Sequence, residues 1–253
     1  MLLLVLYEGR YTVRLFTLSP RLRAVADQIP EGARMADIGT DHAHLPVWLW
    51  KQGKLQSAIA TDVRKGPLSR AQTTAERFGV AEKMSFRLCD GLSGLQPDEV
   101  DTIVIAGMGG ETILQILEAA PWLCQGDYTL LLQPMSSLPD LRKWLSQHQF
   151  SIQKERIVRE GNSLYTIMLV KPGMEEHLTV EEQWLGRMPE DPLRKDYLQM
   201  LMRRYQKVLS GLNDSQAPGD ALRKAELEQV CAAIEAELNA IGGKEHADHT
   251  AGL

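Results

Sequence analysis

The sequence lacks the features that mark secreted, zinc-binding and membrane-spanning chains. Its three cysteines, Cys89, Cys124 and Cys231, are odd in number and far apart, and none belongs to a Cys-x-x-Cys pair. This argues against a disulfide framework and against a structural zinc site. No stretch approaches the roughly eighteen apolar residues of a membrane span. We therefore expect a cytoplasmic protein without a membrane partner.

Positive charge is also scarce, since 28 Lys and Arg stand against 33 Asp and Glu, a net charge of −5. A chain of this charge is not expected to bind nucleic acid indiscriminately. The basic residues are nevertheless grouped, between 142 and 159 and again between 187 and 207. These groups are either solvated helix faces or local basic faces that hold a specific polyanion.

Acidic residues end three short apolar runs at regular intervals. Asp37 and Asp62 lie 25 positions apart, and Asp90 follows at a similar distance. That spacing is the length of one strand–helix–strand unit. Because parallel strands place their carboxyl ends in a row, the three carboxylates are expected to line one crevice.

Alternating apolar runs and helical patterns predict an α/β fold, namely a doubly wound sheet whose last strand is inserted antiparallel. The predicted strands are 34–38, 57–61, 84–88, 101–105, 129–132, 152–158 and 164–170, and the predicted helices are 18–29, 43–52, 66–78, 110–120 and 138–148. The run Met1–Leu6 is interpreted as an extra strand or as an over-extended start.

The apolar spacing changes after Gly173. Steps of three and four residues over 193–212 and 227–241, with a turn at 217–220, predict an antiparallel two-helix arm that packs chiefly against itself. We therefore divide the chain into a domain at 18–172, a helical coiled-coil arm at 173–241 and a disordered tail at 242–253.

The loop after the first strand lacks the Gly-x-Gly-x-x-Gly spacing that brings a backbone against a pyrophosphate. A nucleoside cofactor without a diphosphate fits better, and S-adenosylmethionine is the candidate. Gly39 lets the chain turn sharply towards a ligand, and the next helix offers free amides to a carboxylate. The alternative to a cofactor site is that the three acids at the strand ends only accept hydrogen bonds from amides of their own loops.

A second small-residue loop, Gly107-Met-Gly-Gly110, follows the fourth strand, where base-modifying amino methyltransferases usually carry Asn-Pro-Pro-Tyr. It either leaves room for a flat substrate or forms a tight turn. Gln133 ends the fifth strand, where its amide could bind an adenine edge or tie down a loop. His42 and His44 alternate on one short turn beside Asp41, a pattern that rarely converges on one metal ion, so no metal site is expected.

Together these residues resemble the bacterial tRNA (adenine(22)-N(1))-methyltransferases. The resemblance covers roughly Leu18 to Lys171 and is carried by Leu18-Ser-x-Arg-Leu22, Ala36-Asp-Ile-Gly-Thr-Asp-His-Ala-His-Leu-Pro46, Gly66-Pro67, Asp90-Gly-Leu92, Ile105-Ala-Gly-Met-Gly-Gly110 and Gln133-Pro134. Two positions depart from the family pattern: Met135 stands where asparagine is expected, and Asp62 where glutamate is common.

The resemblance implies a Rossmann-like class I methyltransferase domain, with a seven-stranded sheet, that transfers a methyl group from S-adenosylmethionine to the N1 of a tRNA adenine. Asp62 would hold the ribose hydroxyls, Asp90 the amine of the cofactor's adenine, and Gly39 its methionine end. The candidate cofactor residues are Arg21, Asp37, Gly39, Thr40, Asp62, Val63, Asp90, Gly91, Gly107 and Met108.

Adenine N1 has an in-plane lone pair, so the reaction calls for alignment and for charge near the ring rather than for a strong base. Asp41 and Gln133 are the candidate catalytic residues. The candidate substrate residues are Gly109, Gly110, Arg23, Arg203 and Arg204, with Arg21 as a further phosphate contact. The protein is expected to be a monomer or a weak dimer.

Two other functions stay open at this point. One is a methyltransferase that acts on a small molecule or a protein, for which the arm would only dimerise. The other is a non-catalytic module that keeps the cofactor fold.

Overall fold

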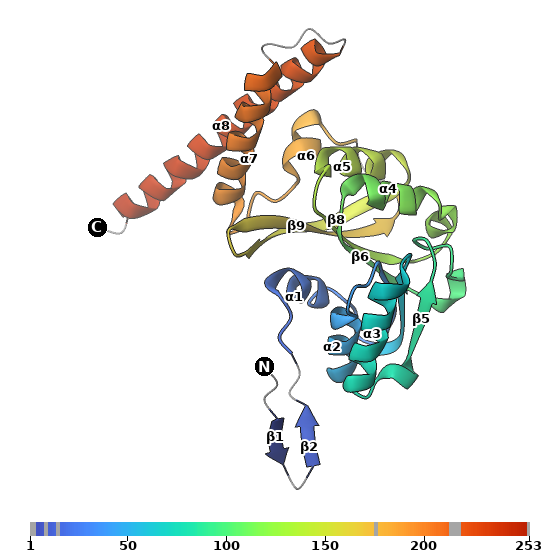
Figure 1. The fold of residues 1–253 in the computed structure, drawn as a ribbon. Coiled ribbons are helices and arrows are strands. Elements are labelled where there is room, and N and C mark those ends of the chain that lie inside the picture. The colour runs from blue at the N-terminus through green and yellow to red at the C-terminus, as the bar shows by residue number, and fades with distance from the viewer. Residues whose placement is uncertain (1–3, 8–9, 14–15, 175–176, 213–218, 252–253) are drawn as a thin grey trace.

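A seven-stranded sheet of order β5-β4-β3-β6-β7-β9-β8 forms the centre of the protein (Figure 1). The computed structural model describes residues 4–7, 10–13, 16–174, 177–212 and 219–251. The first five strands in this order are parallel, and β9 lies antiparallel between β7 and β8. The predicted doubly wound sheet with an antiparallel last strand is confirmed. The strands are β3 (Ala33–Ile38), β4 (Leu55–Asp62), β5 (Met84–Leu88), β6 (Thr102–Met108), β7 (Thr129–Pro134), β8 (Phe150–Glu160) and β9 (Ser163–Pro172).

Helices cover both faces of the sheet because successive strand residues point to opposite sides. Met35, Val104 and Leu131 pack with α1 (Pro20–Ala26), α2 (His44–Lys51) and α3 (Lys65–Arg77) on one face. Their strand neighbours, such as Ile103 and Leu130, pack with α4 (Gly110–Glu118) and α5 (Leu138–Gln147) on the other face. Short 3-10 turns at Ala81–Lys83, Pro97–Glu99 and Pro121–Gln125 complete the connections.

Helix α1 begins at the capping residues that the sequence predicts. The Ser19 hydroxyl accepts a hydrogen bond from the Leu22 N–H at 3.4 Å, and Pro20 occupies the first helical position of α1. Proline is tolerated there because the first N–H groups of a helix have no partner within the helix.

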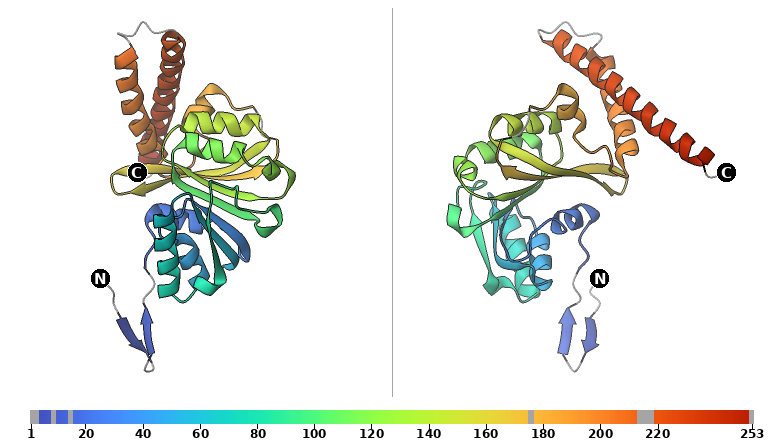
Figure 2. Two further views of the ribbon diagram at one scale, coloured as in Figure 1. Left: turned by 45° about the vertical axis from the view of Figure 1, so that its right-hand side comes forward. Right: turned by 180° about the vertical axis from the view of Figure 1, so that it is seen from behind.

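The arm consists of α7 (Arg194–Leu212) and α8 (Asp220–Ala251), with the short helix α6 (Val180–Leu185) at its base. Figure 2 shows α7 and α8 extending from the end of the molecule that carries α6 and the β8–β9 hairpin. One expectation needs correction. The second helix was expected to end at Ile241 and to be followed by a disordered tail from 242, whereas α8 continues as a helix to Ala251.

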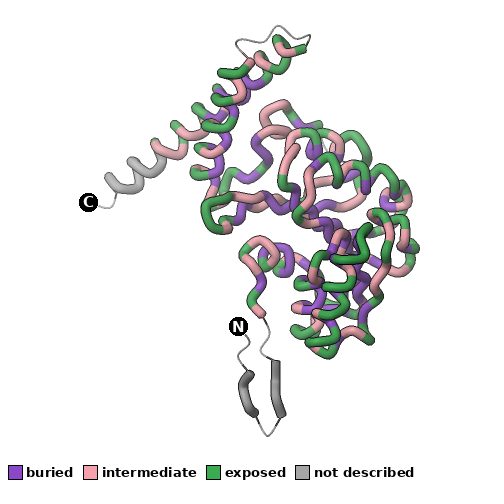
Figure 3. The backbone as a smooth tube through the Cα atoms, viewed as in Figure 1, coloured by how far each residue is buried: buried purple, intermediate pink, exposed green. Residues whose placement is uncertain are grey.

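The packing of the arm agrees with the expectation. Most buried residues of its cluster lie on α7 and α8 themselves, and Ile157 of β8 and Leu185 of α6 join the cluster at the base of the arm. Buried residues are found along the sheet and also on α7 and α8 (Figure 3).

A buried ion pair within the sheet domain also contacts the base of the arm. The side chains of Arg142 on α5 and Glu155 on β8 are 1% and 2% exposed, with Nε and Oε1 2.9 Å apart. Arg142 Nη1 also donates to the main-chain oxygen of Gln183 in α6 at 2.9 Å. Removing one partner of such a pair leaves a buried charge uncompensated, at a cost of about 3–5 kcal/mol. Arg142 thus links the sheet domain to α6 at the base of the arm.

The N-terminal segment forms a separate hairpin of β1 (Leu4–Tyr7) and β2 (Arg10–Val13). The run at the start of the chain is thus an extra strand over the residues that are described. None of the helices in the described part of the chain is both long and apolar enough to span a membrane.

Candidate active site

The carboxyl ends of β3, β4 and β5 lie side by side because these strands are parallel neighbours. Asp37 lies near the end of β3, Asp62 ends β4 opposite Leu88, and Asp90 follows β5. The fold thus brings the three acids to one edge of the sheet, which we call the carboxyl edge. In open α/β sheets this edge is where ligands bind.

The loop after β3 is a tight turn whose backbone conformation favours glycine at position 39. Gly39 has a φ of +72°, and a Cβ there would overlap the Met108 methyl group. Thr40 is buried, its N–H donates to the Thr61 oxygen at 2.8 Å, and its hydroxyl accepts from the Ala43 N–H at 3.0 Å. The loop is therefore held in one shape against the end of β6.

Asp37 is half-buried at this edge, and desolvation shifts its pKa. Desolvation raises the pKa of Asp37 to about 6, although a hydrogen bond with the Thr40 side chain opposes the rise. A carboxylate whose charge is poorly solvated gains most from a cationic ligand. Asp37 therefore marks a position that suits an ammonium or sulfonium group.

Asp62 and Asp90 differ in their exposure. The Asp62 side chain is 6% exposed, and its Oδ1 accepts a hydrogen bond from the Arg64 N–H at 2.8 Å, which fixes its orientation. Asp90 is exposed and precedes Gly91, which has a φ of +51°. Val63, after Asp62, is 63% exposed.

Leu88 is a residue that sequence analysis missed at this edge. It is 49% exposed at the end of β5, beside the acids. Its position as the last apolar residue before the Cys89-Asp90 pair is the signal that could have identified it.

Asp41 is exposed and paired. Its Oδ1 accepts hydrogen bonds from the Arg70 guanidinium, and His42 Nε2 lies 3.5 Å from Oδ2. The hydrogen bond from Arg70 is the main cause of a lowered Asp41 pKa. Asp41 is thus ionised at neutral pH, and it forms an ion pair with Arg70. Among the described residues, no three His, Cys, Asp or Glu side chains are grouped for metal binding.

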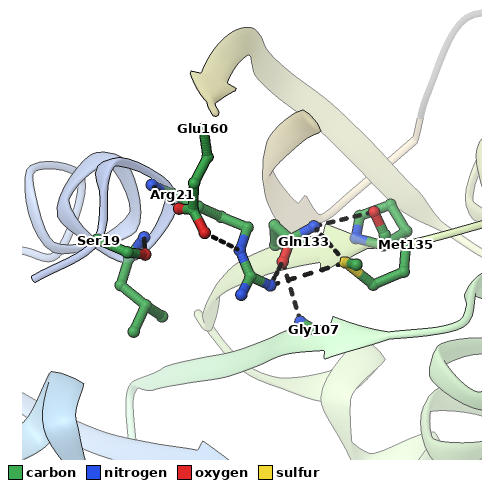
Figure 4. A network of polar contacts seen from close by, with 8 residues as sticks. Ser19, Arg21, Gly107, Gln133, Met135 and Glu160 are labelled. Atoms are coloured by element: carbon green, nitrogen blue, oxygen red, sulfur yellow. Dashed lines mark hydrogen bonds and ion pairs between the residues drawn. The ribbon is translucent and has the colours of Figure 1, made fainter. Parts of the chain in front are cut away.

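Gln133 is fully buried, with its amide engaged at both ends (Figure 4). Its Oε1 accepts from Arg21 Nη1 at 2.5 Å and from the Gly107 N–H at 3.0 Å, and its Nε2 donates to the Pro134 oxygen at 3.0 Å. Of the two interpretations of this amide, tying down a loop is the one visible in the structure. Contact with a base would require it to exchange these partners.

Arg21 connects this amide to the β8–β9 hairpin. Its main-chain N–H donates to Glu160 Oε2 at 3.0 Å, and its guanidinium lies 5.3 Å from the centre of the Tyr165 ring. The Arg21 side chain is 21% exposed. It is better placed to shape the carboxyl edge than to contact phosphates on the surface.

The loop after β6 packs closely on the loop after β7. Gly107 has a φ of +79°, the Gly110 N–H donates to the Ser136 oxygen at 3.1 Å, and a Cβ at Gly110 would lie 2.6 Å from that oxygen. Gly109 is also partly buried here, beside Ser136. The tight-turn interpretation of this loop thus agrees with the geometry, and its contact with substrate stays a prediction.

The remaining basic candidates are exposed on two helices. Arg203 and Arg204 are exposed on α7, in the arm. Arg23 is exposed on α1, where it pairs with Asp27 at 2.8 Å and lies over the Trp48 ring. A cavity of about 430 Å³ lies between α5, α6 and the arm, and none of the acids of the carboxyl edge lines it.

Comparison with known proteins agrees with this geometry. The family described as "Methyltransferase domain" matches residues 18–168, more than half of the chain. A Bacillus subtilis tRNA (adenine(22)-N(1))-methyltransferase is 39% identical over 156 residues, which span 62% of this chain and 66% of that protein.

Two solved structures are similar over most of the chain. The B. subtilis m1A22 tRNA methyltransferase TrmK is 27% identical, covers 89% of this chain and 100% of its own, and has a TM-score of 0.78. A Streptococcus pneumoniae protein in complex with S-adenosyl-L-methionine is 34% identical, covers 88% and 100%, and has a TM-score of 0.72. The chain belongs to the methyltransferase domain family and, within it, to the tRNA (adenine(22)-N(1))-methyltransferases.

Proposed function

We propose that this protein transfers a methyl group from S-adenosylmethionine to the N1 of an adenine in the D-arm of tRNA, at position 22. The observation that carries the proposal is the carboxyl edge, where Asp37, Asp62 and Asp90 stand in a row in a member of this family. The names of the relatives supply the adenine position.

The residues at this edge fit the cofactor. The poorly solvated carboxylate of Asp37 suits its positively charged amino-acid end, and the Gly39 turn follows directly after it in the chain. Asp62 would accept the ribose hydroxyls, and Asp90 the adenine amine. Val63 and Leu88, on neighbouring strands, would flank the adenine ring.

S-adenosylmethionine supplies a methyl group on a positively charged sulfur. The chain has to align adenine N1 with the methyl–sulfur bond and to stabilise the charge that develops on the ring. Asp41 is the carboxylate proposed to stabilise that positive charge. Its ion pair with Arg70 weakens this effect. Since N1 is masked in a base pair, the adenine must be unpaired or flipped out.

Phosphate contacts are assigned to exposed arginines, Arg23 on α1 and Arg203 and Arg204 on α7. They provide local positive charge on a protein that is acidic as a whole. The proposal includes a cytoplasmic location and a monomer or weak dimer, which light scattering with and without tRNA would test.

The test is methyl transfer from labelled S-adenosylmethionine to unmodified tRNA, with protein extract and small-molecule pools as parallel acceptors. Label in tRNA alone is the expected result. Label in the other pools would support a different methyltransferase. Cofactor binding without transfer to any acceptor would support a non-catalytic module.

A further inference from the structure

Exposed apolar side chains are concentrated at the carboxyl edge. Among the described residues, five large apolar side chains are strongly exposed: Val63, Leu88, Met135, Met174 and Leu222. The first three follow or end β4, β5 and β7. Single exposed apolar residues need no explanation, but three at the ligand-binding edge indicate surfaces that a ligand covers.

The sheet order separates these three residues. Val63 and Leu88 belong to neighbouring strands on one side of β3, together with Asp62 and Asp90. Met135, which is 45% exposed, lies on the other side of β3, beyond β6 and beside the Gly107–Gly110 loop. A cofactor nucleoside held by Asp62 and Asp90 would cover Val63 and Leu88. Met135 would then be free to contact the other ligand, the tRNA base.

Met135 is held in place although methionine is a flexible side chain. Its N–H donates to the Met108 oxygen at 2.8 Å. Its sulfur lies 3.5 Å from Gln133 Nε2 and 3.7 Å from Arg21 Nη1 (Figure 4). Glu160 in turn accepts a hydrogen bond from the Arg21 main chain. The sulfur is thus turned towards two donors, while 45% of the residue stays exposed.

We propose that Met135 is the apolar surface on which the face of the target adenine rests, with Arg21 and Gln133 as the positioning residues that hold it. This inference rests on the proposed function. A thioether cannot donate a hydrogen bond, so Met135 contacts the polarizable face of the ring and does not read its amino group. A fixed surface matters because N1 must be held in line with the methyl group.

The test variant is Met135→Ala. Met135→Leu is the rescue variant, because it restores an apolar side chain of similar volume. Met174→Ala is the control, because it truncates a methionine that is 87% exposed elsewhere. The readouts are the single-turnover methylation rate at saturating tRNA, the Kd for S-adenosylmethionine and the Tm. Met135→Ala is expected to lower the rate roughly tenfold with unchanged Kd and Tm, because the apolar contact with the face of the ring is lost. Met135→Leu should recover most of the rate, and Met174→Ala should match the wild type.

A second variant, Leu88→Ala, distinguishes the residues proposed to contact the cofactor from the residue proposed to contact the target adenine. Leu88→Ala is expected to weaken S-adenosylmethionine binding, whereas Met135→Ala should not. The inference is overturned if Met135→Ala methylates at the wild-type rate, or if it loses cofactor affinity as Leu88→Ala does. Failure of the wild-type protein to methylate tRNA would instead contradict the proposed function.

Discussion

Replacing Asp37 by Asn is expected to stabilise the free protein and to weaken its binding of S-adenosylmethionine. Burial raises the pKa of Asp37 from 3.8 to about 6. The folded protein therefore holds this proton more tightly than the unfolded chain does, and the ionised carboxylate lowers stability above pH 6. Asn keeps the shape of the side chain and a hydrogen-bonding group for Thr40, but it carries no charge.

The magnitude follows from the shift in pKa. A rise of about two pH units, at about 1.4 kcal/mol per unit, corresponds to at most roughly 3 kcal/mol at pH 8. The sign follows from linkage: between about pH 4 and pH 6 the folded state binds more protons, so this contribution to stability falls as pH rises. Asp37→Asn should remove that fall, and its gain in stability should be larger at pH 8 than at pH 5.

Cofactor binding should change in the opposite direction. A cation beside Asp37 favours its carboxylate, so wild-type affinity should weaken as pH falls through about 6. Asp37→Asn should bind at least tenfold more weakly at pH 8, because a charge-assisted hydrogen bond is worth about 1.5–3 kcal/mol. Its affinity should also depend less on pH. Urea unfolding and calorimetric titration at pH 5 and pH 8 provide both measurements. A variant that is less stable at pH 8, or that binds like the wild type at both pH values, would refute the reasoning.

Three further variants test the other residues. Asp62→Ala should weaken cofactor binding more than tenfold, because two ribose hydrogen bonds to a charged acceptor contribute roughly 1.5–3 kcal/mol each; an unchanged calorimetric Kd would remove Asp62 from the site. Asp41→Asn should keep cofactor affinity nearly intact but slow single-turnover methyl transfer, and a large loss of affinity would instead place Asp41 among the cofactor contacts. The double variant Arg203→Gln, Arg204→Gln should weaken tRNA binding and lower the slope of log affinity against log salt concentration by about 1 to 2. Its Kd for the cofactor should not change. A slope equal to that of the wild type would give the arm another role, such as self-association.

The order of the elements was predictable because their signals are local. The buried strands are short apolar runs that end at acids, as at Asp37 and Asp62, and α1 starts at a Ser-Pro cap. Helix α6 was missed because it is only six residues long, although Thr179 and Glu182 form a capping box that the sequence displays.

Contacts between distant segments were not predictable in this way. Arg142 pairs with Glu155 of β8 and donates to the Gln183 oxygen of α6, and these contacts form only when α5, β8 and α6 are packed together. The partners of Gln133 come from α1 and β6, so its position at a strand end indicated a polar role but not its burial. Substitution is for the same reason a cleaner test of the arm than deletion, which would leave Arg142 without its α6 partners.

The most direct test of the central claim is to map the methylated base. A tRNA transcript that carries adenine at position 22 is incubated with the protein and S-adenosylmethionine and then copied by reverse transcriptase, which stops at an N1-methylated adenine. We expect a new stop at position 22 and none in a matched transcript that carries guanine there. A stop elsewhere, or no stop while the cofactor is bound with normal affinity, would contradict the assignment of this protein as a tRNA adenine-22 N1-methyltransferase.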